Sequence, residues 1–497
     1  MTRRYPYLSK SMLIAAWQCR KRLYLEHHHP ELGEVSPQTE SLWKTGREVG
    51  QLARHLYATE ASVKIDFNQR THLMLAQTKS LVASDIDFPI FEATFQHDGI
   101  LVRSDVLIPA AGCWRAIEVK ASTSVKDHHV LDCAIQDWVM RQVGLDVASV
   151  SLAHVDNRFV YPGQGDYAGL LLEHDLTAAV RRLEPSVTEL IATARAAVTG
   201  PMPEVNVGMH CSRPYDCQFM RFCWPTDTEY PLAGLGGARA KLGEWAALGY
   251  RDIRDVEARH ITAPTQLRIH HVTCRGEPEI LDGARRAFAA LTYPRYYLDF
   301  ETIGPAVPFW AGTRPYAAVP VQWSCHVDDG AGDGSAASMR HAEFLDLSGE
   351  PPMRGLAERL IDCLGESGPV LMYTNYEENV IKHLIELLPD LTTPLQAIIE
   401  RLYDLHPVVR ENYYHPKMLG SWSIKAVMPT INPDMDYSDL VGINEGTAAA
   451  AGFIEAIDPT TTRARKAELE QQLRRYCRFD TEAMVEIVRF FVNREPN

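Results

Sequence analysis

The sequence lacks any long uninterrupted hydrophobic run. No stretch approaches the roughly 18 apolar residues that indicate a membrane-spanning helix, and the opening residues, MTRRYPYLSKSM, have no apolar core of the kind found in secretion signals. We therefore expect a cytoplasmic protein that makes no membrane contact.

The sequence also lacks an excess of positive charge. Its 50 lysines and arginines stand against 64 acidic residues, which gives a formal net charge of −14. This balance excludes a uniformly basic nucleic-acid coat protein, so any contact with nucleic acid has to be local.

Cysteine is sparse as well, with 10 in 497 residues. That is too few for a disulfide scaffold, and a reducing compartment keeps such residues as thiols or metal ligands.

The remaining composition is that of a large folded protein. Hydrophobic residues make up 46% of the chain, and its length corresponds to about three domains. We expect a multidomain α/β protein, with a first domain over residues 1–225, a small helical linker over 226–290 and a last domain over 291–497. Two short helical patterns around Leu248 and Gly249 resemble a helix-hairpin-helix, and a plain helical spacer is the alternative. The glycine-rich stretch near residue 330 predicts a hairpin tip.

Three charged residues of the first domain are expected to meet on two neighbouring strands. Two strand patterns, GILVRSDVLI and CWRAIEVKAS, are joined by the turn-forming residues PAAG. Alternation along the second strand points Glu118 and Lys120 to one face, and Asp105 on the first strand can join them. Two carboxylates can hold a divalent cation, and a nearby lysine can assist an attacking water. A cross-strand ion pair without catalytic meaning is the alternative.

The next helix and strand extend this pattern. The stretch HHVLDCAIQDWVMRQVGLD has helical apolar spacing, from which Gln136 can reach back toward the strands, and DVASVSLAHVD follows as another strand. In this order the residues resemble the PD-(D/E)xK nuclease core in its RecB-like branch, although Met140 stands where that branch usually has tyrosine. The resemblance implies a nuclease in which Asp105 and Glu118 bind Mg²⁺ or Mn²⁺. Further candidate ligands upstream are His55 and Glu92.

Four cysteines lie around this nuclease-like core. Cys211, Cys217 and Cys223 occur in CSRPYDCQFMRFC, and Cys19 lies far upstream among basic residues. Four thiolates are the usual complement of an iron-sulfur cluster or a structural zinc site, whereas ordinary buried thiols are the alternative on spacing alone. One cysteine before the core and three after it resembles the iron-sulfur RecB-like nucleases, including the CRISPR adaptation nuclease family. The resemblance implies a four-iron four-sulfur cluster that joins the ends of the domain, with zinc as the alternative.

A second group of acidic residues is expected in the last domain. In the strand pattern YYLDFET, alternation points Asp299 and Glu301 to one face. Tyr476 and Asp480 are four residues apart in a helical pattern, so they share a face of that helix. Carboxylates placed in this way can complete a two-metal site, and a tyrosine hydroxyl can orient the attacking water.

The order of these motifs resembles the DEDD exonuclease superfamily of the RNase H-like fold, in its tyrosine-bearing variant. The stretch PVLMYTNYEENVIKHL fits the middle motif and puts Glu377 where most members have aspartate. The longer side chain shifts a ligand oxygen by about one bond length, which favours Mn²⁺ over the geometrically exacting Mg²⁺. For Asp404 we expect a role at a helix terminus.

Basic and aromatic residues alternate between the middle and last motifs. They are Arg401, Arg410, Lys417 and Lys425 with Tyr413, Tyr414 and Trp422. Such a composition suits single-stranded nucleic acid, because basic residues follow phosphates and aromatic rings stack on bases. Packing of the rings in the core is the alternative.

Together the resemblances imply a metal-dependent exonuclease with two active sites. Single-stranded DNA or DNA ends are the expected substrate, in repair or in defence against foreign DNA. The alternatives are an RNA-processing exonuclease and a non-catalytic or single-site nucleic-acid-binding scaffold subunit. The sequence indicates no particular protein partner.

Overall fold

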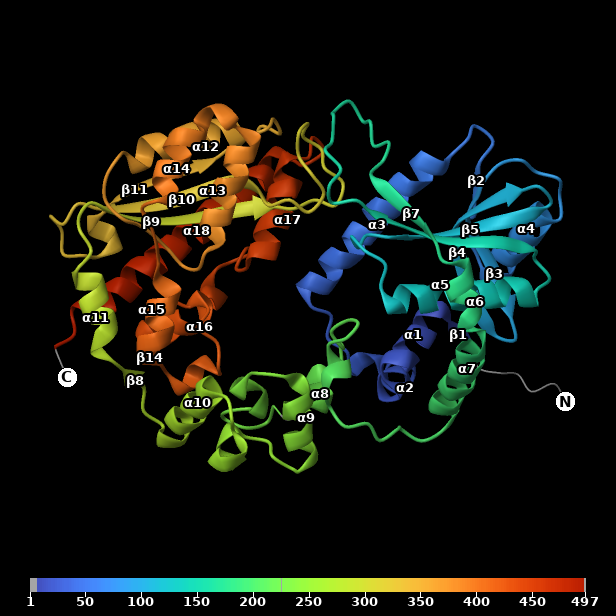
Figure 1. Ribbon diagram of the computed structural model, residues 1–497, viewed down its shortest axis with the longest axis horizontal. Coiled ribbons are helices and arrows are strands. Elements are labelled where there is room, and N and C mark those ends of the chain that lie inside the picture. The colour runs from blue at the N-terminus through green and yellow to red at the C-terminus, as the bar shows by residue number, and fades with distance from the viewer. Residues whose placement is uncertain (1–6, 225, 496–497) are drawn as a thin grey trace. The chain divides into compact units, whose positions relative to one another are not determined.

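The structure is a computed structural model that describes residues 7–224 and 226–495. The chain divides into two compact units, of which the first is Met1–Trp224 with Pro305–Pro315 and the second is Pro225–Gly304 with Tyr316–Asn497. Both units combine sheets with helices (Figure 1), which confirms the α/β class and the multidomain organisation. Residue 225, where we placed the end of the first domain, lies outside the described residues.

The first unit is built on a seven-stranded sheet in its described part, in the order β2-β3-β4-β5-β6-β7 with β1 paired to β4. Its strands are β1 (Leu8–Ser9), β2 (Val63–Lys64), β3 (Ile90–His97), β4 (Ile100–Ala110), β5 (Cys113–Lys120), β6 (Val147–Val155) and β7 (Leu171–Asp175). Its helices are α1 (Lys10–Gln18), α2 (Arg20–His28), α3 (Pro37–Tyr57), α4 (Thr71–Val82), α5 (Asp127–Gln142), α6 (Thr177–Arg182), α7 (Glu184–Thr199) and α8 (Met220–Cys223).

The hairpin of β4 and β5 forms where the sequence predicted it. Ala111 and Gly112 at its tip have positive φ angles of 49° and 85°, the backbone form that matches the twist of paired strands. From β5 the chain passes through α5 to β6, which lies parallel to β5. Apolar residues of the sheet and of α1, α5 and α7 form one core, so the strands that carry the expected acids are firmly held.

The second unit contains a five-stranded sheet in the order β11-β10-β9-β12-β13. The pairs of β10 with β9 and β11 are antiparallel, whereas β12 is parallel to β9 and to β13. The strands of this unit are β8 (Glu279–Ile280), β9 (Arg295–Ile303), β10 (Val319–Asp328), β11 (Arg340–Leu345), β12 (Val370–Met372), β13 (Leu402–Asp404) and β14 (Tyr413–Tyr414). Its helices are α9 (Arg239–Ala247), α10 (Pro264–Arg275), α11 (Asp282–Ala289), α12 (Met353–Leu364), α13 (Tyr376–Leu387), α14 (Thr392–Ile399), α15 (Leu405–Asn412), α16 (Ile424–Ile431), α17 (Gly446–Ile457) and α18 (Arg463–Val492).

Helices cover both faces of this sheet (Figure 1). On β10 the side chain of Gln322 donates to the carbonyl oxygen of Leu473 in α18 at 3.0 Å, and Trp323 donates to that of Leu356 in α12 at 3.2 Å. Neighbouring side chains of a strand point to opposite faces, so α12 and α18 lie on opposite sides. The 30-residue α18 begins after Thr462, whose side chain caps the helix.

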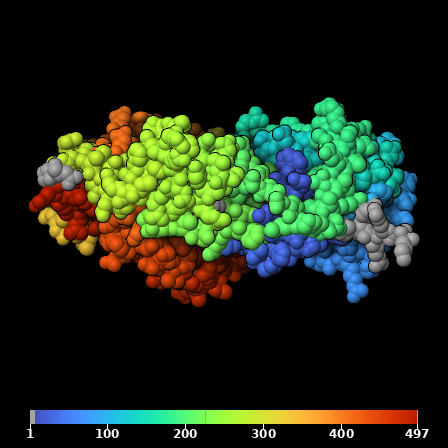
Figure 2. Space-filling view, turned by 90° about the horizontal axis from the view of Figure 1, so that it is seen from below, coloured from blue at the N-terminus to red at the C-terminus, as the bar shows by residue number. Residues whose placement is uncertain are grey.

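The segment 226–290, which we expected as a linker, belongs to the second unit. Its helix α9 ends at the expected turn, where Gly249 takes a φ of 93°. The helix expected next is only the 3-10 turn Ile253–Asp255. There the side chains of Asp252 and Asp255 accept backbone N–H groups, which offers the backbone an alternative to a longer helix. In Figure 2 the yellow-green surface of the segment adjoins the orange surface of later residues in the same unit.

Two further expectations can be compared with the structure. The glycine-rich stretch near residue 330 connects β10 to β11, which pair antiparallel, so the predicted hairpin is confirmed. Among the described residues, no helix combines the length and apolar character needed to span a bilayer.

Two candidate active sites and a cysteine pocket

The first candidate site lies where β4 and β5 pair. Val106 pairs with Ile117 in the antiparallel ladder, so the preceding Asp105 and the following Glu118 are neighbours across the strands. Asp105 accepts the backbone N–H of Val119 through Oδ2 at 2.7 Å. Glu118 is only 4% exposed. The structure therefore brings Asp105 next to Glu118, as the sequence predicted for the two neighbouring strands.

Helices α1 and α5 add two charged groups that the sequence interpretation missed. The Nζ atom of Lys10 lies 2.8 Å from Glu118 Oε1 and 3.3 Å from Asp132 Oδ1. Lys120 Nζ lies 2.7 Å from the same Glu118 oxygen and 2.5 Å from Asp132 Oδ2. Gln136 donates to Glu118 Oε2 at 2.6 Å, as its place on the helix predicted. The spacing of Asp132 and Gln136, one helical turn apart, was a signal that could have identified Asp132.

The two paired acids, Asp105 and Glu118, have pKa values that are shifted in opposite directions. Burial and the neighbouring Glu118 raise the pKa of Asp105 to about 8. Burial also works against ionised Glu118, but the ammonium groups of Lys10 and Lys120 outweigh it and hold the pKa of Glu118 below its usual range. Of the two acids, Glu118 therefore favours the charged form and Asp105 the protonated form.

The upstream ligand candidates lie outside this network. His55 is exposed on α3, and the described structure gives it no hydrogen bond or ion pair with Asp105 or Glu118, so its role as a ligand stays a prediction. Glu92 on β3 has a φ of 61°, a strained conformation for a residue with a side chain. Its carboxylate forms an ion pair with Arg54 at 3.2 Å.

The four cysteines selected from the sequence line one pocket. Cys19 lies at the start of α2, and the other three, Cys211, Cys217 and Cys223, come from the segment that ends in α8. Lys21, Arg22 and His210 also line this pocket. None of these thiols is in a disulfide. Residues almost two hundred positions apart therefore present sulfur to the same space.

Backbone N–H groups are directed at the sulfur atoms of this pocket. The donors are Lys21 and Arg22 for Cys19, Phe219 for Cys217 and Gly208 for Cys211. Burial raises the pKa of the thiols, to about 11 for Cys217, whereas the N–H groups favour the thiolate form. Such sulfur-directed hydrogen bonds fit thiolates that are ligands of a metal or cluster.

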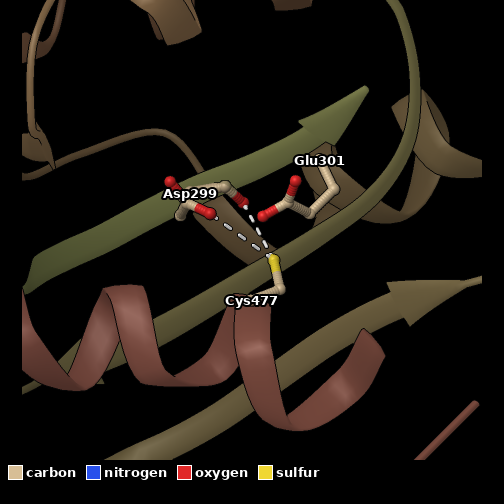
Figure 3. Close-up of side chains that lie close together, drawn as sticks. All are labelled: Asp299, Glu301 and Cys477. Atoms are coloured by element: carbon tan, nitrogen blue, oxygen red, sulfur yellow. Dashed lines mark hydrogen bonds between the residues drawn. The ribbon is translucent and has the colours of Figure 1, made fainter. Parts of the chain in front are cut away.

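The second candidate site lies between the central strand β9 and helix α18 (Figure 3). Asp299 and Glu301 project from β9 toward Cys477 on α18, and ligand atoms of these three side chains all lie within 4.8 Å of one another. Glu377, in the first turn of α13, and Asp480, three residues after Cys477, act electrostatically on the two β9 acids. The four carboxylates expected from three separate motifs thus meet in one place.

This acidic cluster has little compensating positive charge. Burial raises the pKa of all four carboxyl groups, to about 8 for Glu377 and about 6 for Asp480, and the neighbouring acids add to the effect for Asp299 and Glu301. The Oε2 atom of Glu377 is buried without a hydrogen-bond partner. A buried carboxylate oxygen without a donor is costly, so the cluster suits a bound cation.

Three further residues lie beside the cluster: Tyr476 on α18, Tyr437 in a 3-10 turn and Lys425 on α16. Tyr437 donates to Asp480 Oδ1 at 2.5 Å, and Tyr476 is buried beside the acids, which together with burial raise the pKa of its hydroxyl. Lys425 Nζ lies 5.1 Å and 5.2 Å from the ring centroids of Tyr437 and Tyr476. Sequence reasoning missed Tyr437 and Cys477. The position of Cys477 three residues before Asp480, on the same helix face, was a signal for the thiol.

The aromatic rings proposed for base stacking are core residues instead. Tyr413, Tyr414 and Trp422 are all buried, and Tyr413 pairs with Ile280 in the small sheet of β14 and β8. The stacking interpretation is therefore wrong for these rings. Asp404 accepts the N–H of His406 at 2.9 Å and caps α15, which confirms its role at a helix terminus.

Comparisons with known proteins match parts of the chain. Residues 296–423 match a family described as "Domain of unknown function (DUF2779)". The chain is similar to "Uncharacterized protein UU173" of Ureaplasma parvum serovar 3, with 23% identity over 238 residues. That similarity covers 44% of this chain and 34% of the relative, about a third of its length. Among solved structures the chain is similar to the "Crystal structure of SSO0001", at 13% identity and a TM-score of 0.20, over 41% of this chain and 91% of that one. These descriptions state no activity, so function has to be inferred from the sites.

Proposed function

We propose that the protein is a metal-dependent nuclease, most simply an exonuclease, that hydrolyses the phosphodiester bonds of DNA. The observation that carries the proposal is the convergence of Asp299, Glu301, Glu377 and Asp480 on one buried site, where a carboxylate oxygen of Glu377 has no partner. Acidic clusters with little positive charge nearby are suited to divalent cations, and a pair of such cations supports phosphodiester hydrolysis.

The order of elements supports a fold assignment for each unit. The succession β9, β10, β11, α12, β12 and α13 supports an RNase H-like, DEDD-type exonuclease domain. In the first unit, the hairpin of β4 and β5 leads through α5 into the parallel β6. That succession, with the acids at the paired strands, supports a RecB-like PD-(D/E)xK nuclease domain.

In the second site the four carboxylates would hold two Mg²⁺ or Mn²⁺ ions. Ions bound there would lower the pKa of a water and stabilise charge on the scissile phosphate. Tyr476 keeps its hydroxyl protonated, because burial and the nearby acids raise its pKa, and it orients the attacking water. Tyr437 fixes Asp480 through its hydrogen bond. Lys425 supplies positive charge at the edge of the cluster.

In the first site Asp105 and Glu118 would hold a cation of the same kind. Gln136 fixes the orientation of Glu118 by donating to Oε2, and Lys120 assists the attacking water. Because burial and the neighbouring Glu118 favour the protonated form of Asp105 in the absence of a cation, metal binding here would release a proton.

We also propose that Cys19, Cys211, Cys217 and Cys223 hold a four-iron four-sulfur cluster, with zinc as the alternative. The shared pocket and the N–H groups directed at the sulfur atoms support a metal-thiolate site. A cluster held by these four residues would join the start of α2 to the segment that ends in α8. Protein purified without oxygen is expected to be brown, with iron and sulfide near stoichiometric amounts. A colourless, zinc-loaded protein would overturn the cluster assignment.

Single-stranded DNA or DNA ends are the substrates that we propose. RNA is the alternative, since RNase H-like nucleases act on both nucleic acids. Competition between DNA and RNA strands of matched sequence separates the two, because only a site that senses the 2′-hydroxyl discriminates strongly.

Cleavage of end-labelled DNA tests the nuclease proposal. Single- and double-stranded substrates are incubated with Mn²⁺ or Mg²⁺ and wild type, Glu118→Ala or Asp299→Ala, with Asp85→Ala and Glu400→Ala as controls at exposed acids of each unit. If each site variant removes a distinct set of products while both controls behave as wild type, the protein is a two-site nuclease. Absence of cleavage by pure wild type that still binds DNA overturns the proposal.

A single-site or scaffold function is the second candidate. It is favoured by the ion pairs of Lys10 and Lys120 with Glu118 and Asp132, which neutralise the first site without a metal. The single-site form predicts that Glu118→Ala leaves the products unchanged while Asp299→Ala removes them, and the scaffold form predicts DNA binding without cleavage.

A further inference from the structure

Cys477 places a thiol inside the second acidic site. The residue is fully buried on the face of α18 that turns toward β9. Its Sγ atom lies 3.6 Å from Asp299 Oδ2 and 3.8 Å from the Asp299 carbonyl oxygen (Figure 3). The thiol therefore faces the carboxylates and not only the apolar core.

The distance between thiol and carboxylate fits a shared metal ion. Sulfur at about 2.3 Å and oxygen at about 2.1 Å from one tetrahedral ion lie about 3.6 Å from each other. The observed separation of Cys477 Sγ and Asp299 Oδ2 is also 3.6 Å. Glu301 adds a carboxylate oxygen, and one ligand atom from each of the three side chains lies within 4.8 Å of the other two. The three side chains thus offer one sulfur and two carboxylate oxygens as ligands for one ion.

Glu377 gives an independent indication that a cation belongs here. Its side chain is 3% exposed, and its Oε2 atom has no hydrogen-bond partner. Its charge acts on both Asp299 and Glu301, so this buried side chain lies near the same carboxylates. A buried acceptor of this kind needs a positive partner.

We propose that Asp299, Glu301 and Cys477 form a site for a thiophilic divalent cation of the zinc type. Thiolate ligands select zinc, whereas sites of carboxylate oxygen alone suit magnesium and manganese. On binding, the thiol proton is released to solvent, and a bond from Sγ to the metal replaces the S–H···O bond to Asp299. The inference rests on the proposed function for its location, but metal binding does not require that the site be catalytic.

Cobalt absorption tests the thiolate ligand directly. Co²⁺ substitutes for Zn²⁺, and a thiolate bound to Co²⁺ gives a near-ultraviolet charge-transfer band that oxygen ligands do not give. The full-length protein, dialysed against a chelator, is titrated with Co²⁺ as wild type, Cys477→Ser and Cys274→Ser, a control at an exposed thiol of the same unit. Wild type and the control are each expected to bind one Co²⁺ ion more than Cys477→Ser binds, and that additional ion should produce the charge-transfer band. The thiols of the cysteine pocket contribute equally to all three proteins and cancel in the difference.

Zinc affinity provides the second measurement. Competition with a chromophoric chelator is expected to show that Cys477→Ser weakens Zn²⁺ binding at least about tenfold while changing Mn²⁺ affinity less than about threefold. Equal Zn²⁺ affinity and equal bands in wild type and Cys477→Ser overturn the proposal. Circular dichroism shows whether the variant folds; if it does not, Glu301→Gln replaces it, and unchanged Zn²⁺ affinity in that variant overturns the proposal too.

DNA cleavage with Mn²⁺ separates this inference from the proposed function. A protein that binds Co²⁺ through Cys477 but cleaves no DNA supports the metal site and overturns the nuclease. A protein that cleaves DNA but shows no thiolate band with Co²⁺ supports the nuclease and overturns the Cys477 metal site.

Discussion

The side-chain amide of Gln18 donates to the backbone carbonyl oxygen of Tyr215 at 2.7 Å, across 197 residues of sequence. The same nitrogen donates to the carbonyl oxygen of His210, also at 2.7 Å. Gln18 is the last residue of α1, which begins with Lys10. One buried side chain therefore joins the helix that carries Lys10 to the segment that carries three of the pocket cysteines.

Tyr215 extends this connection to the first acidic site. Its ring centroid lies 5.0 Å from that of His128 in the first turn of α5. Its hydroxyl is also within the electrostatic influence of Lys120 and Asp132. The cysteine pocket and the acid-lysine network thus share one framework, and we expect that loosening one disturbs the other.

Replacing Gln18 by alanine should destabilise the first unit. Two partly buried backbone carbonyl groups lose their donor, so we expect the free energy of unfolding to fall by about 1–3 kcal/mol. Chemical unfolding followed by tryptophan fluorescence measures the change. Gln51→Ala, at an exposed position of α3, is the control and should stay within about 0.5 kcal/mol of wild type. Equal stability of both variants would mean that the Gln18 contact is not a structural tie.

Replacing Lys10 by methionine should make the stability less dependent on pH in the acid range. Lys10 helps to hold the pKa of Glu118 below its usual range. A carboxylate with a lowered pKa contributes stability above its unfolded value of about 4.3, and that contribution is lost as the pH falls. At pH 7 we expect Lys10→Met to lose about 1–3 kcal/mol, because Lys120 still pairs with Glu118. Unfolding at several pH values should show this difference narrowing below about pH 4.

The conservative variant Lys10→Arg separates charge from packing. It retains the positive charge beside Glu118, so its pH profile should follow that of wild type. If the loss in Lys10→Met is the same at every pH, packing and not charge explains it.

Local sequence patterns were sufficient to predict the acidic residues of both sites and the strands that carry them. Glu118 with Lys120, and Asp299 with Glu301, are two residues apart on strands, and strand geometry alone places each pair on one face. The turn at Gly112 between β4 and β5 was visible in the same way. These predictions depend only on a few neighbouring residues, which is why they needed no tertiary information.

Contacts between distant elements could not be predicted in that way. Lys10 reaches Glu118 across 108 residues, and Tyr437 reaches Asp480 across 43. Both contacts depend on how a helix or turn packs on a sheet. The same limit explains Tyr413 and Trp422, whose alternation with basic residues resembled a surface although strand pairing and the core bury them.

The second unit should be less stable at high pH when no metal is bound. The pKa values of Glu377 and Asp480 in the folded chain are raised to about 8 and about 6, above the values near 4 of unfolded chains. Between about pH 4 and pH 8 the unfolded chain therefore binds fewer protons than the folded chain, and stability falls as the pH rises. Each pKa unit corresponds to about 1.4 kcal/mol as an upper bound.

Thermal unfolding with and without Mn²⁺ measures this effect. The cation takes the place of the bound protons, so the increase in Tm on adding Mn²⁺ should be larger at high pH than at low pH. Glu377→Gln removes one titrating group and should flatten the profile of the metal-free protein. An identical slope in wild type and this variant would show that Glu377 does not contribute to it.

Replacing Tyr437 by phenylalanine should shift metal binding to higher pH. The Tyr437 hydroxyl donates to Asp480 at 2.5 Å, and that bond opposes the rise in pKa that burial imposes on Asp480. Without the donor the pKa of Asp480 rises further, so a cation has to displace a more tightly held proton. We expect the midpoint of Mn²⁺ binding against pH, measured by calorimetry, to move up by on the order of one unit. Tyr476→Phe removes the hydroxyl proposed to orient water, so it should reduce cleavage and leave this midpoint near that of wild type. The opposite assignment, in which Tyr476→Phe moves the midpoint and Tyr437→Phe does not, would exchange the roles of the two tyrosines.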